Sequence, residues 1–415
     1  GITNGVSSTA FTDGTICQTF DYHLYKFVST ATQHYQECVI CGDKTVAKDH
    51  SIGKAATCKE LAVCATCGES YGEYDHTKHL SDEFDDEGFS LCCGYGYEPT
   101  TLVTEDNYAA LGLTSDYVGY HAIGNAGQLL YFTNGIKNDY DNFKSINVVL
   151  ISDIDVNPGY TFNSDGTVSY NNATVTSGWR TWTPIGTFEN SFTKTFDGNY
   201  HTISGLYVND ETMKYVGVFG ELRPGKVCNL GVLNSYFNAQ QYVGGISGHA
   251  SFDATVENCY SYATISAEYG GGGIVSAGTS SSKDPAVNII NCYYNGVLKP
   301  KGTTYMSGIY GGSNAAIENS YYNSDNCKYG NTKYAMSDAD FKSGVVAYLL
   351  NGDQSTITYG QTIGTEDYPV FGGARVYGGY ENCESDTLIA TNDSSIALNP
   401  TTGHAWEYSA SGTTI

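Results

Sequence analysis

Two short β-type patterns alternate along the chain between about residues 120 and 335. The first pattern places apolar residues around one asparagine, and successive copies lie 29, 33 and 28 residues apart, at Asn229, Asn258, Asn291 and Asn319. The second pattern is glycine-rich around one apolar residue, as in 243–248 and 270–278. A period of about 30 residues is too short to bury its own core, so each repeat must stack on the next. The pattern predicts a right-handed parallel β-helix, an all-β solenoid.

The repeated asparagines and glycines have a physical role in such a solenoid. Successive coils lie about 4.8 Å apart, the spacing of hydrogen-bonded strands. An amide at a fixed position can donate to one neighbouring coil and accept from the other. A glycine permits the sharp bend between two sheets. We therefore expect an asparagine ladder, next to which Cys259 and Cys292 are core thiols or an inter-coil disulfide, with core packing favoured.

Amphipathic segments on both sides of the repeats are expected to cover the ends of the solenoid, because open edges pair with other chains. Residues 122–136 predict a short helix and residues 146–151 an apolar strand at the front. At the back, Ser337 can open a helix that Gly352 stops, and a short irregular strand pair follows at 361–380. The expected domains are a Cys/His-rich module (1–99), the β-helix with its N-terminal cap (100–335), a C-terminal cap with closing strands (336–383) and the start of a further module or linker (384–415).

The segment before residue 94 is a separate module that holds most of the cysteines and histidines. It has few apolar runs, so it needs metal or disulfide cross-links to keep a shape. Two Cys-x-x-Cys pairs with flanking ligands have the spacing of structural zinc sites: His34, Cys38, Cys41 and His50, then Cys58, Cys64 and Cys67 with His76 or His79. Disulfides and free thiols are the alternatives that a secreted context leaves open. Structural zinc is the only cofactor we expect.

Charge and composition narrow the class of partner. The formal net charge of −24 repels phosphate backbones and anionic lipids, so nucleic acid is not an expected partner. Charged residues make up 15% of the chain, whereas glycine (49) and tyrosine (36) are abundant, which is typical of extracellular β-rich proteins. No stretch approaches about 18 consecutive apolar residues, so we expect no membrane insertion in this fragment. An export signal or wall anchor is expected outside it.

Tyrosines recur beside the predicted ladder. Alternate residues of a strand point to opposite faces, so one tyrosine of each adjacent pair is expected to face solvent. Exposed tyrosines can stack on sugar rings or grip a partner protein. Tyrosine is also simply the amphipathic strand residue available to a surface with few charges. The candidate binding residues are Tyr260, Tyr262, Tyr293, Tyr294, Tyr321 and Tyr322.

Several motifs resemble the GLUG-motif repeat proteins of bacterial cell surfaces: Trp-Thr-Pro-Ile-Gly at 182–186, the run at 196–206 and Tyr-Val-Gly-Val-Phe-Gly at 215–220. The resemblance covers about 105–380. It implies a right-handed β-helix, as in adhesins and in the non-catalytic parts of IgA-type metallopeptidases. The N-terminal module resembles Cys/His-rich repeats of Gram-positive gut bacteria. Neither likeness implies a defined activity.

Catalytic motifs are missing from the sequence. Neither the His-Glu-x-x-His string of zinc peptidases nor the Gly-x-Ser-x-Gly elbow of serine hydrolases occurs. Asp153, Asp155 and Asp197 are the carboxylates that a β-helical glycoside hydrolase or polysaccharide lyase could use, but they also fit a strand end and a turn. The sequence favours a non-enzymatic extracellular adhesin or spacer module of a cell-surface protein, binding a host or bacterial glycan or a surface protein. The alternatives are such a hydrolase or lyase, and the accessory region of a larger surface protease.

Overall fold

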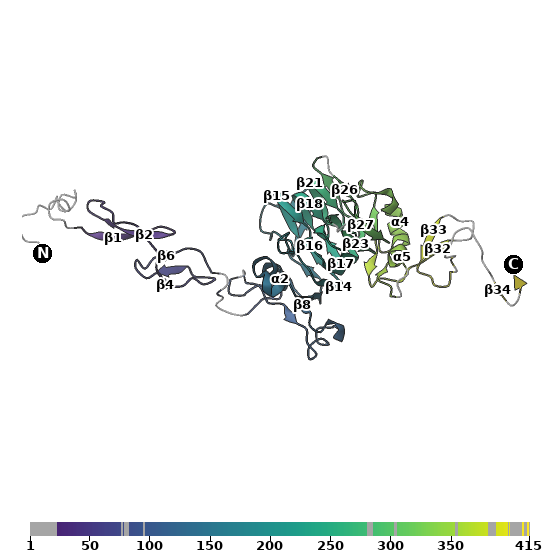
Figure 1. Ribbon diagram of the computed structural model, residues 1–415, viewed down its shortest axis with the longest axis horizontal. Helices are drawn as coiled ribbons and strands as arrows, with labels where there is room; N and C mark the ends of the chain where they lie inside the picture. Colours follow the sequence, from purple (N-terminus) through teal and green to yellow (C-terminus); the bar gives the residue numbers. More distant parts are fainter. Residues whose placement is uncertain are drawn as a thin grey trace, which may run out of the picture. The chain divides into compact units, whose positions relative to one another are not determined.

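The computed structural model describes residues 23–75, 78, 83–93, 96–279, 285–302, 305–352, 356–380, 387–396, 398, 409–410 and 413–414. The chain separates into two compact units, Gly1–Glu98 and Pro99–Ile415. Strands dominate the structure and only 10% of it is helical, as Figure 1 shows.

The N-terminal unit contains two small antiparallel sheets. The first is made of β1 (Tyr25–Ser29), β2 (Gln33–Cys38) and β3 (Lys48–Asp49). The second is made of β4 (Ile52–Lys54), β5 (Ala62–Cys64) and β6 (Ser70–Tyr71). Among the described residues of this unit, the buried apolar side chains are Cys38, Cys58, Cys64, Cys92 and Phe89. A core made almost entirely of cysteine buries little apolar surface, which agrees with the expected need for cross-links.

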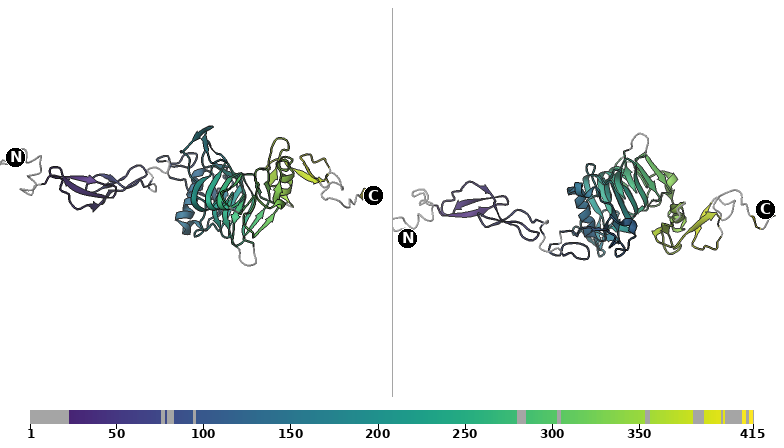
Figure 2. Two further views of the ribbon diagram at one scale, coloured as in Figure 1. Left: turned by 90° about the horizontal axis from the view of Figure 1, so that it is seen from above. Right: turned by 60° about the horizontal axis from the view of Figure 1, so that its bottom comes forward.

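The C-terminal unit contains a parallel β-solenoid of about seven turns, whose stacked coils are visible in Figure 2. This confirms the predicted fold class. The large sheet is formed by β7 (Thr101–Leu102), β8 (His121–Ile123), β9 (Val148–Leu150), β10 (Ile154–Asp155), β14 (Thr195–Ser204), β17 (Lys226–Leu233), β20 (Ala254–Ser261), β23 (Val287–Ile290), β24 (Tyr293–Tyr294), β27 (Ala315–Glu318), β28 (Tyr321–Asn323) and β29 (Ala335–Met336).

Two further sheets complete each coil. The second sheet is formed by β15 (Tyr207–Val216), β18 (Tyr236–Gly244), β21 (Thr264–Gly272), β25 (Leu298–Pro300) and β26 (Met306–Ser307). The third sheet is formed by β16 (Phe219–Leu222), β19 (Ser247–Ala250) and β22 (Val275–Ala277). A β-carbon on Gly272 would lie 1.9 Å from the carbonyl oxygen of Val275, so the turn from the second to the third sheet admits only glycine there.

Apolar side chains stack in register inside the solenoid. One column runs through successive strands of the large sheet and consists of Phe196, Val227, Val256, Ile289 and Ile317. Its first four members have no exposed surface. Burial of each such side chain stabilises the folded chain by about 1.5–3 kcal/mol. The side chain is buried only when the neighbouring coils are folded against it. The repeat therefore folds as a stack, as the period of the sequence predicts.

The asparagine ladder forms as expected. Asn258 Nδ2 donates to Asn229 Oδ1 at 3.0 Å, and Asn291 Nδ2 donates to Asn258 Oδ1 at 3.2 Å. Asn319 extends the ladder by donating to Asn291 Oδ1 at 3.1 Å. All four asparagines adopt the left-handed backbone conformation, with φ between 42° and 54°. The position thus selects asparagine twice, for its tolerance of positive φ and for its amide.

Replacement of Asn258 by alanine is expected to lower the free energy of unfolding of the solenoid by roughly 2–4 kcal/mol. The substitution places a β-carbon in the left-handed region and leaves the amide groups of Asn229 and Asn291 without their partner. Urea denaturation followed by circular dichroism measures the loss. Asn258→Gly is the matched control, because glycine restores the backbone and removes only the amide; equal losses in the two variants would contradict the backbone part of the argument.

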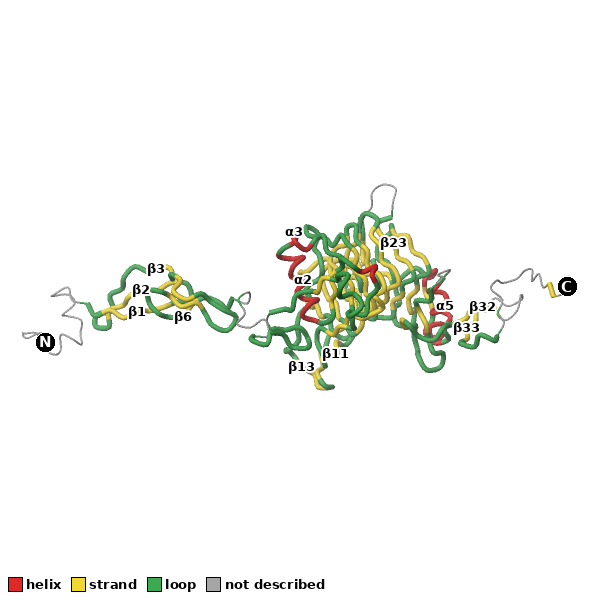
Figure 3. Tube along the Cα trace, turned by 90° about the horizontal axis from the view of Figure 1, so that it is seen from below, coloured by secondary structure: helices red, strands yellow, loops and turns green. Residues whose placement is uncertain are grey.

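The start of the solenoid is covered by helices, which Figure 3 shows in red. They are η2 (Ser115–Tyr117), α2 (Ala126–Asn138) and α3 (Tyr140–Phe143). Asn125 caps α2 by accepting a hydrogen bond from the backbone N–H of Gln128 at 2.9 Å. The helix expected over 122–136 begins later, because residues 121–123 pair with β9 as strand β8. The neighbouring strand satisfies their backbone groups better than one more helical turn. A separate three-stranded antiparallel sheet follows, formed by β11 (Tyr160–Phe162), β12 (Val168–Tyr170) and β13 (Ala173–Val175).

The segment after the repeats contains two short helices, α4 (Asp338–Lys342) and α5 (Val345–Asn351), instead of the single helix expected there. Ser337 opens α4 with a capping box, but Gly344 adopts φ +85° and breaks the helix. A short strand pair forms here from β30 (Tyr359–Gly360) and β31 (Val370–Phe371), and its first strand lies just before the expected range of 361–380. The remaining elements are η3 (Thr332–Tyr334), β32 (Tyr377–Tyr380), β33 (Leu388–Thr391), β34 (Ser409–Ala410) and β35 (Thr413–Thr414).

Candidate metal centres and the buried tyrosine column

Each Cys-x-x-Cys pair of the N-terminal unit sits in a tight turn at the end of a strand. The N–H of Gly42 donates to the carbonyl of Cys38, and the N–H of Gly68 donates to the carbonyl of Cys64, both at 2.9 Å. Both glycines have positive φ, 75° and 76°, which closes the turn without a side-chain clash. The turn brings the two sulfurs of each pair to one side, as chelation of a single ion requires.

Four ligand atoms converge at the Cys64 turn, from His34, His50, Cys64 and Cys67. The Nδ1 atoms of His34 and His50 lie 3.4 Å apart. Cys64 Sγ lies 3.7 Å from His34 Nδ1, and Cys67 Sγ lies 3.8 Å from His50 Nδ1. Groups spaced in this way surround one centre and could hold a tetrahedral metal ion. We call them the four-ligand cluster.

The environment of this cluster favours the thiolate form of Cys64 and fixes the orientation of the His50 ring. Burial opposes ionisation of Cys64, but the backbone N–H of Cys67 and the ring of His50 outweigh it and lower the thiol pKa to about 5. The thiolate that binds metals is therefore the form present at neutral pH. The Thr30 carbonyl accepts a hydrogen bond from His50 Nε2 at 3.0 Å and raises the pKa of that ring, so a metal ion must compete with a proton for this ligand. This contact leaves Nδ1 of His50 facing the sulfurs.

Two further groups of potential ligands lie in the same unit. His23 joins Cys38 and Cys41, with Cys41 Sγ 3.4 Å from His23 Nδ1. Burial opposes ionisation of Cys38 too, but N–H donors from Cys41 and Ile40 lower its pKa to about 5. The other group consists of Cys58, Cys92 and Cys93. Cys58 Sγ and Cys92 Sγ lie 3.2 Å apart, well beyond the about 2.05 Å of a disulfide bond.

The structure groups the predicted ligands differently from the sequence. His34 and His50 were expected beside Cys38 and Cys41, but they lie beside the Cys64 pair. His34 and Cys38 stand near opposite ends of β2, about 13 Å apart along an extended strand, so they cannot share an ion.

Two other ligand predictions also change. Cys58 was expected with Cys64 and Cys67, but it lies with Cys92 and Cys93. His76 and His79 lie outside the described residues. His23 was not among the predicted ligands, and the β1–β2 hairpin brings it beside the Cys38 turn by pairing Tyr25 with Cys38.

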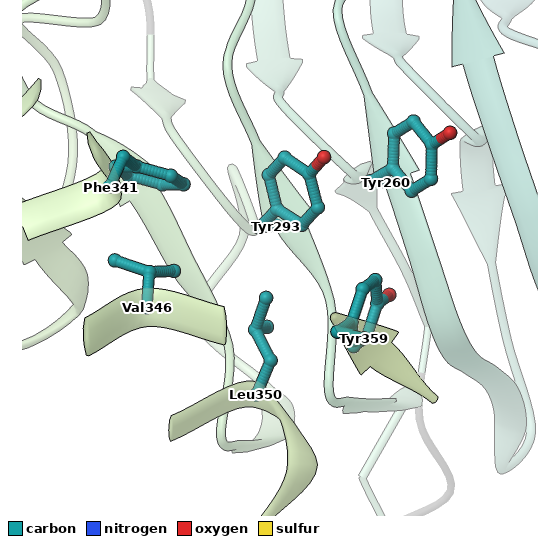
Figure 4. Close-up of a cluster of buried hydrophobic side chains, with 6 residues drawn as sticks. All are labelled: Tyr260, Tyr293, Phe341, Val346, Leu350 and Tyr359. Atoms are coloured by element: carbon teal, nitrogen blue, oxygen red, sulfur yellow. The ribbon is translucent and has the colours of Figure 1, made fainter. Parts of the chain in front are cut away.

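One tyrosine of each adjacent pair was expected to face solvent, but the column is largely buried. Tyr294 and Tyr322 are almost fully buried, and Tyr294 donates from its hydroxyl to the carbonyl of Ala263 at 2.9 Å. Tyr260 and Tyr293 are buried under α4, α5 and β30, and Figure 4 shows their rings beside the apolar side chains of these elements, Phe341, Val346, Leu350 and Tyr359. Tyr262 and Tyr321 pack against the same cluster and are half-buried. For the pair at 293–294 the expectation was wrong, because the C-terminal segment folds back over this face, whereas Tyr321 of the next pair keeps part of its exposure.

Alkaline solution is expected to unfold the solenoid cooperatively. Burial raises the pKa of Tyr262 to about 12 and the pKa values of Tyr293, Tyr294 and Tyr359 well above their usual range. The pKa of tyrosine in an unfolded chain is about 10, so above that pH the unfolded chain binds fewer protons than the folded chain. Stability is then intact below about pH 10 and falls as pH rises further. Tyrosinate absorbance of the buried rings should appear together with loss of the β-sheet circular dichroism; full ionisation with the sheet intact would contradict this expectation.

The candidate catalytic carboxylates serve turns and ladders. Asp155 Oδ1 accepts from the N–H of Asn157 at 3.0 Å, and Asp153 Oδ1 accepts from the N–H of Thr202 at 2.8 Å. Asp197 accepts from the Asn229 amide at 3.0 Å and thereby starts the asparagine ladder. Cys259 and Cys292 are buried thiols rather than a disulfide, as the sequence favoured.

No protein family, curated protein or solved structure matches this chain. None of the described helices is long and apolar enough to cross a membrane.

Proposed function

We propose that this chain is a non-catalytic, extracellular adhesin or spacer module of a bacterial cell-surface protein of the GLUG-motif type. The observation that carries the proposal is that the recurring side chains of the solenoid are engaged in contacts between its coils. The asparagines bond to one another between coils, and most of the tyrosines beside them are buried. Side chains that hold the coils together support the role of a rigid scaffold. Such a scaffold would present a separate surface to a glycan or a protein.

We propose zinc as the ion of the four-ligand cluster. Two thiolates and two imidazoles are a donor set that zinc takes in structural sites. Tetrahedral bonds of about 2.0–2.1 Å to nitrogen and about 2.3 Å to sulfur place ligand atoms about 3.3–3.8 Å apart. The measured separations of 3.4, 3.7 and 3.8 Å fit that geometry. Zinc bound there would link the first sheet to the second within a unit whose apolar core is small.

Metal analysis of the purified full chain tests the zinc proposal. We expect zinc to co-purify with the protein, and the thiols of the N-terminal unit to become titratable only after chelation. Intact-mass measurement after alkylation under denaturing, chelating conditions is the second readout. A loss of two hydrogens for each cysteine pair would show disulfides instead of zinc and would overturn the proposal.

The non-catalytic role is tested separately, on polysaccharides. Beads coated with the full chain are expected to adhere to host mucin or epithelial cells, whereas the soluble chain should release neither reducing ends nor unsaturated sugars from a polysaccharide panel. Product that disappears in Asp153→Asn or Asp155→Asn variants would replace the proposal with the glycoside hydrolase or lyase alternative. An accessory region of a larger surface protease would also release no product. The two roles differ in adhesion, which only the adhesin role predicts.

A further inference from the structure

A ladder of tyrosine rings follows the turn between the second and third sheets and is interrupted at one coil. Tyr215 and Tyr242 stack with ring centroids 5.2 Å apart and an interplanar angle of 13°. Both residues have left-handed φ, 61° and 57°. The strand register places Gly270 at the same position of the next coil, also with positive φ (71°), and Tyr305 at that position of the coil after it. No ring therefore projects from this register position at Gly270, and the ring of the preceding residue, Tyr269, packs edge-on against both Tyr242 and Tyr305.

The absence of a ring at this position leaves a pocket of about 410 Å³, which we call the Gly270 hollow. Its walls include Tyr242, Tyr269 and Tyr305. Tyr305 is 70% exposed and Tyr269 is 43% exposed, so both rings are open to a ligand from solvent. The volume lies in the range of small-molecule sites. Unlike the tyrosines of the large sheet, these rings are not covered by α4 and α5.

A buried hydroxyl in the wall of the hollow has no partner. Ser276 is fully buried, and its Oγ makes no hydrogen bond to the described residues. This oxygen lies 3.4 Å from the position that a β-carbon would occupy on Gly270, so it faces the space left by the missing side chain. A buried hydroxyl without a partner is unfavourable by about the value of a lost hydrogen bond. A polar ligand in the hollow would satisfy it.

We infer that the Gly270 hollow binds one neutral pyranose ring of a glycan. The inference rests on the proposed adhesin role and names its ligand class. The apolar face of a pyranose stacks on tyrosine, and its hydroxyls match the unpartnered Ser276 Oγ. None of the described residues that line the hollow is charged, and the net charge of the chain is −24, so a neutral sugar is favoured over a uronic or sialic acid.

Saturation-transfer NMR on the full chain tests the assignment with methyl pyranosides of glucose, galactose, mannose and N-acetylglucosamine. We expect at least one of them to bind with a Kd on the order of 1 mM, as a single small ring allows. Methyl glucuronide should bind on the order of tenfold more weakly. Equal binding of the glucuronide would overturn the choice of a neutral sugar, and binding of none of the glycosides would overturn the site.

Substitution of Gly270 by tyrosine is the decisive variant. Tyrosine is tolerated at this register position with positive φ in the two preceding coils, so G270Y should fold, complete the ladder and abolish binding. Tyr305→Ala should weaken binding on the order of tenfold by removing one stacking ring. Tyr170→Ala is the matched control, because Tyr170 is 42% exposed on the β11–β13 sheet and does not line the hollow. Unchanged binding in G270Y, with circular dichroism confirming the fold, would overturn the inference.

Ser276→Ala separates a binding role from a structural one. Because Ser276 Oγ has no partner in the described structure, its removal should leave thermal stability unchanged or slightly higher. Sugar affinity should fall on the order of fivefold. Loss of stability with unchanged affinity would show a structural hydroxyl and would contradict its assignment as a ligand contact. If beads coated with G270Y still adhere, the Gly270 hollow is not the binding site, but the adhesin role stands. If the chain releases products from a polysaccharide, the proposed non-catalytic function is overturned.

Discussion

Replacement of Cys64 by serine is expected to remove one metal ion per chain and to unfold the second sheet of the N-terminal unit. Structural zinc contributes apparent free energies of about 10–16 kcal/mol in small domains, and the serine hydroxyl is not ionised and does not replace a thiolate ligand. The unit has little else to hold it, because its described core consists of four cysteines and Phe89. His34 and His50 would lose the sulfur that completes their cluster.

Metal content by mass spectrometry and limited proteolysis of residues 23–75 measure the two effects. Cys292→Ser is the matched control: it also replaces a buried cysteine, but the next coil already carries Ser320 at the equivalent position. We expect this control to keep the full metal content. A C64S protein that retains both its metal and its protease resistance would show that the four-ligand cluster is not a metal site.

Replacement of His249 by alanine is expected to lower the free energy of unfolding of the solenoid by about 3–5 kcal/mol. His249 Nδ1 lies 2.6 Å from Glu221 Oε2 on the adjacent strand of the third sheet, and the glutamate is fully buried. The other carboxylate oxygen, Oε1, has no hydrogen-bond partner among the described residues. Removal of the imidazole would leave the buried carboxyl group of Glu221 without its hydrogen-bond partner, a far larger penalty than the loss of an exposed ion pair.

Residue-resolved hydrogen exchange is the suitable measurement, because a stacked repeat can open locally before it unfolds. Protection should fall most in β16 and β19. The double variant Glu221→Leu with His249→Leu is the control, since apolar replacement of a buried pair is often neutral or stabilising. If His249→Ala and the double variant destabilise the solenoid equally, the unpaired carboxyl group of Glu221 is not the cause.

The sequence by itself determined the features that depend on local geometry or on a fixed period. The parallel solenoid, the asparagine ladder and the stacked apolar columns follow from side chains that recur at one place in every coil. Each copy repeats the same contact with the next, so registered copies predict both the element and its neighbour. The two Cys-x-x-Cys turns could likewise be recognised, because four consecutive residues and one glycine make each turn.

Only the tertiary structure decided which groups meet over long distances along the chain. His34 and His50 join the Cys64 pair because the first sheet pairs as a hairpin, and no local pattern encodes that choice. Tyr260 and Tyr293 are buried because α4, α5 and β30 return over the large sheet. The alternation of residues along a strand does not predict that a later segment covers this face. The Gly270 hollow exists because glycine stands at the register position that tyrosine occupies in the neighbouring coils. A single glycine in the sequence does not predict a pocket, because the pocket depends on the side chains of the neighbouring coils, and the fold places those coils.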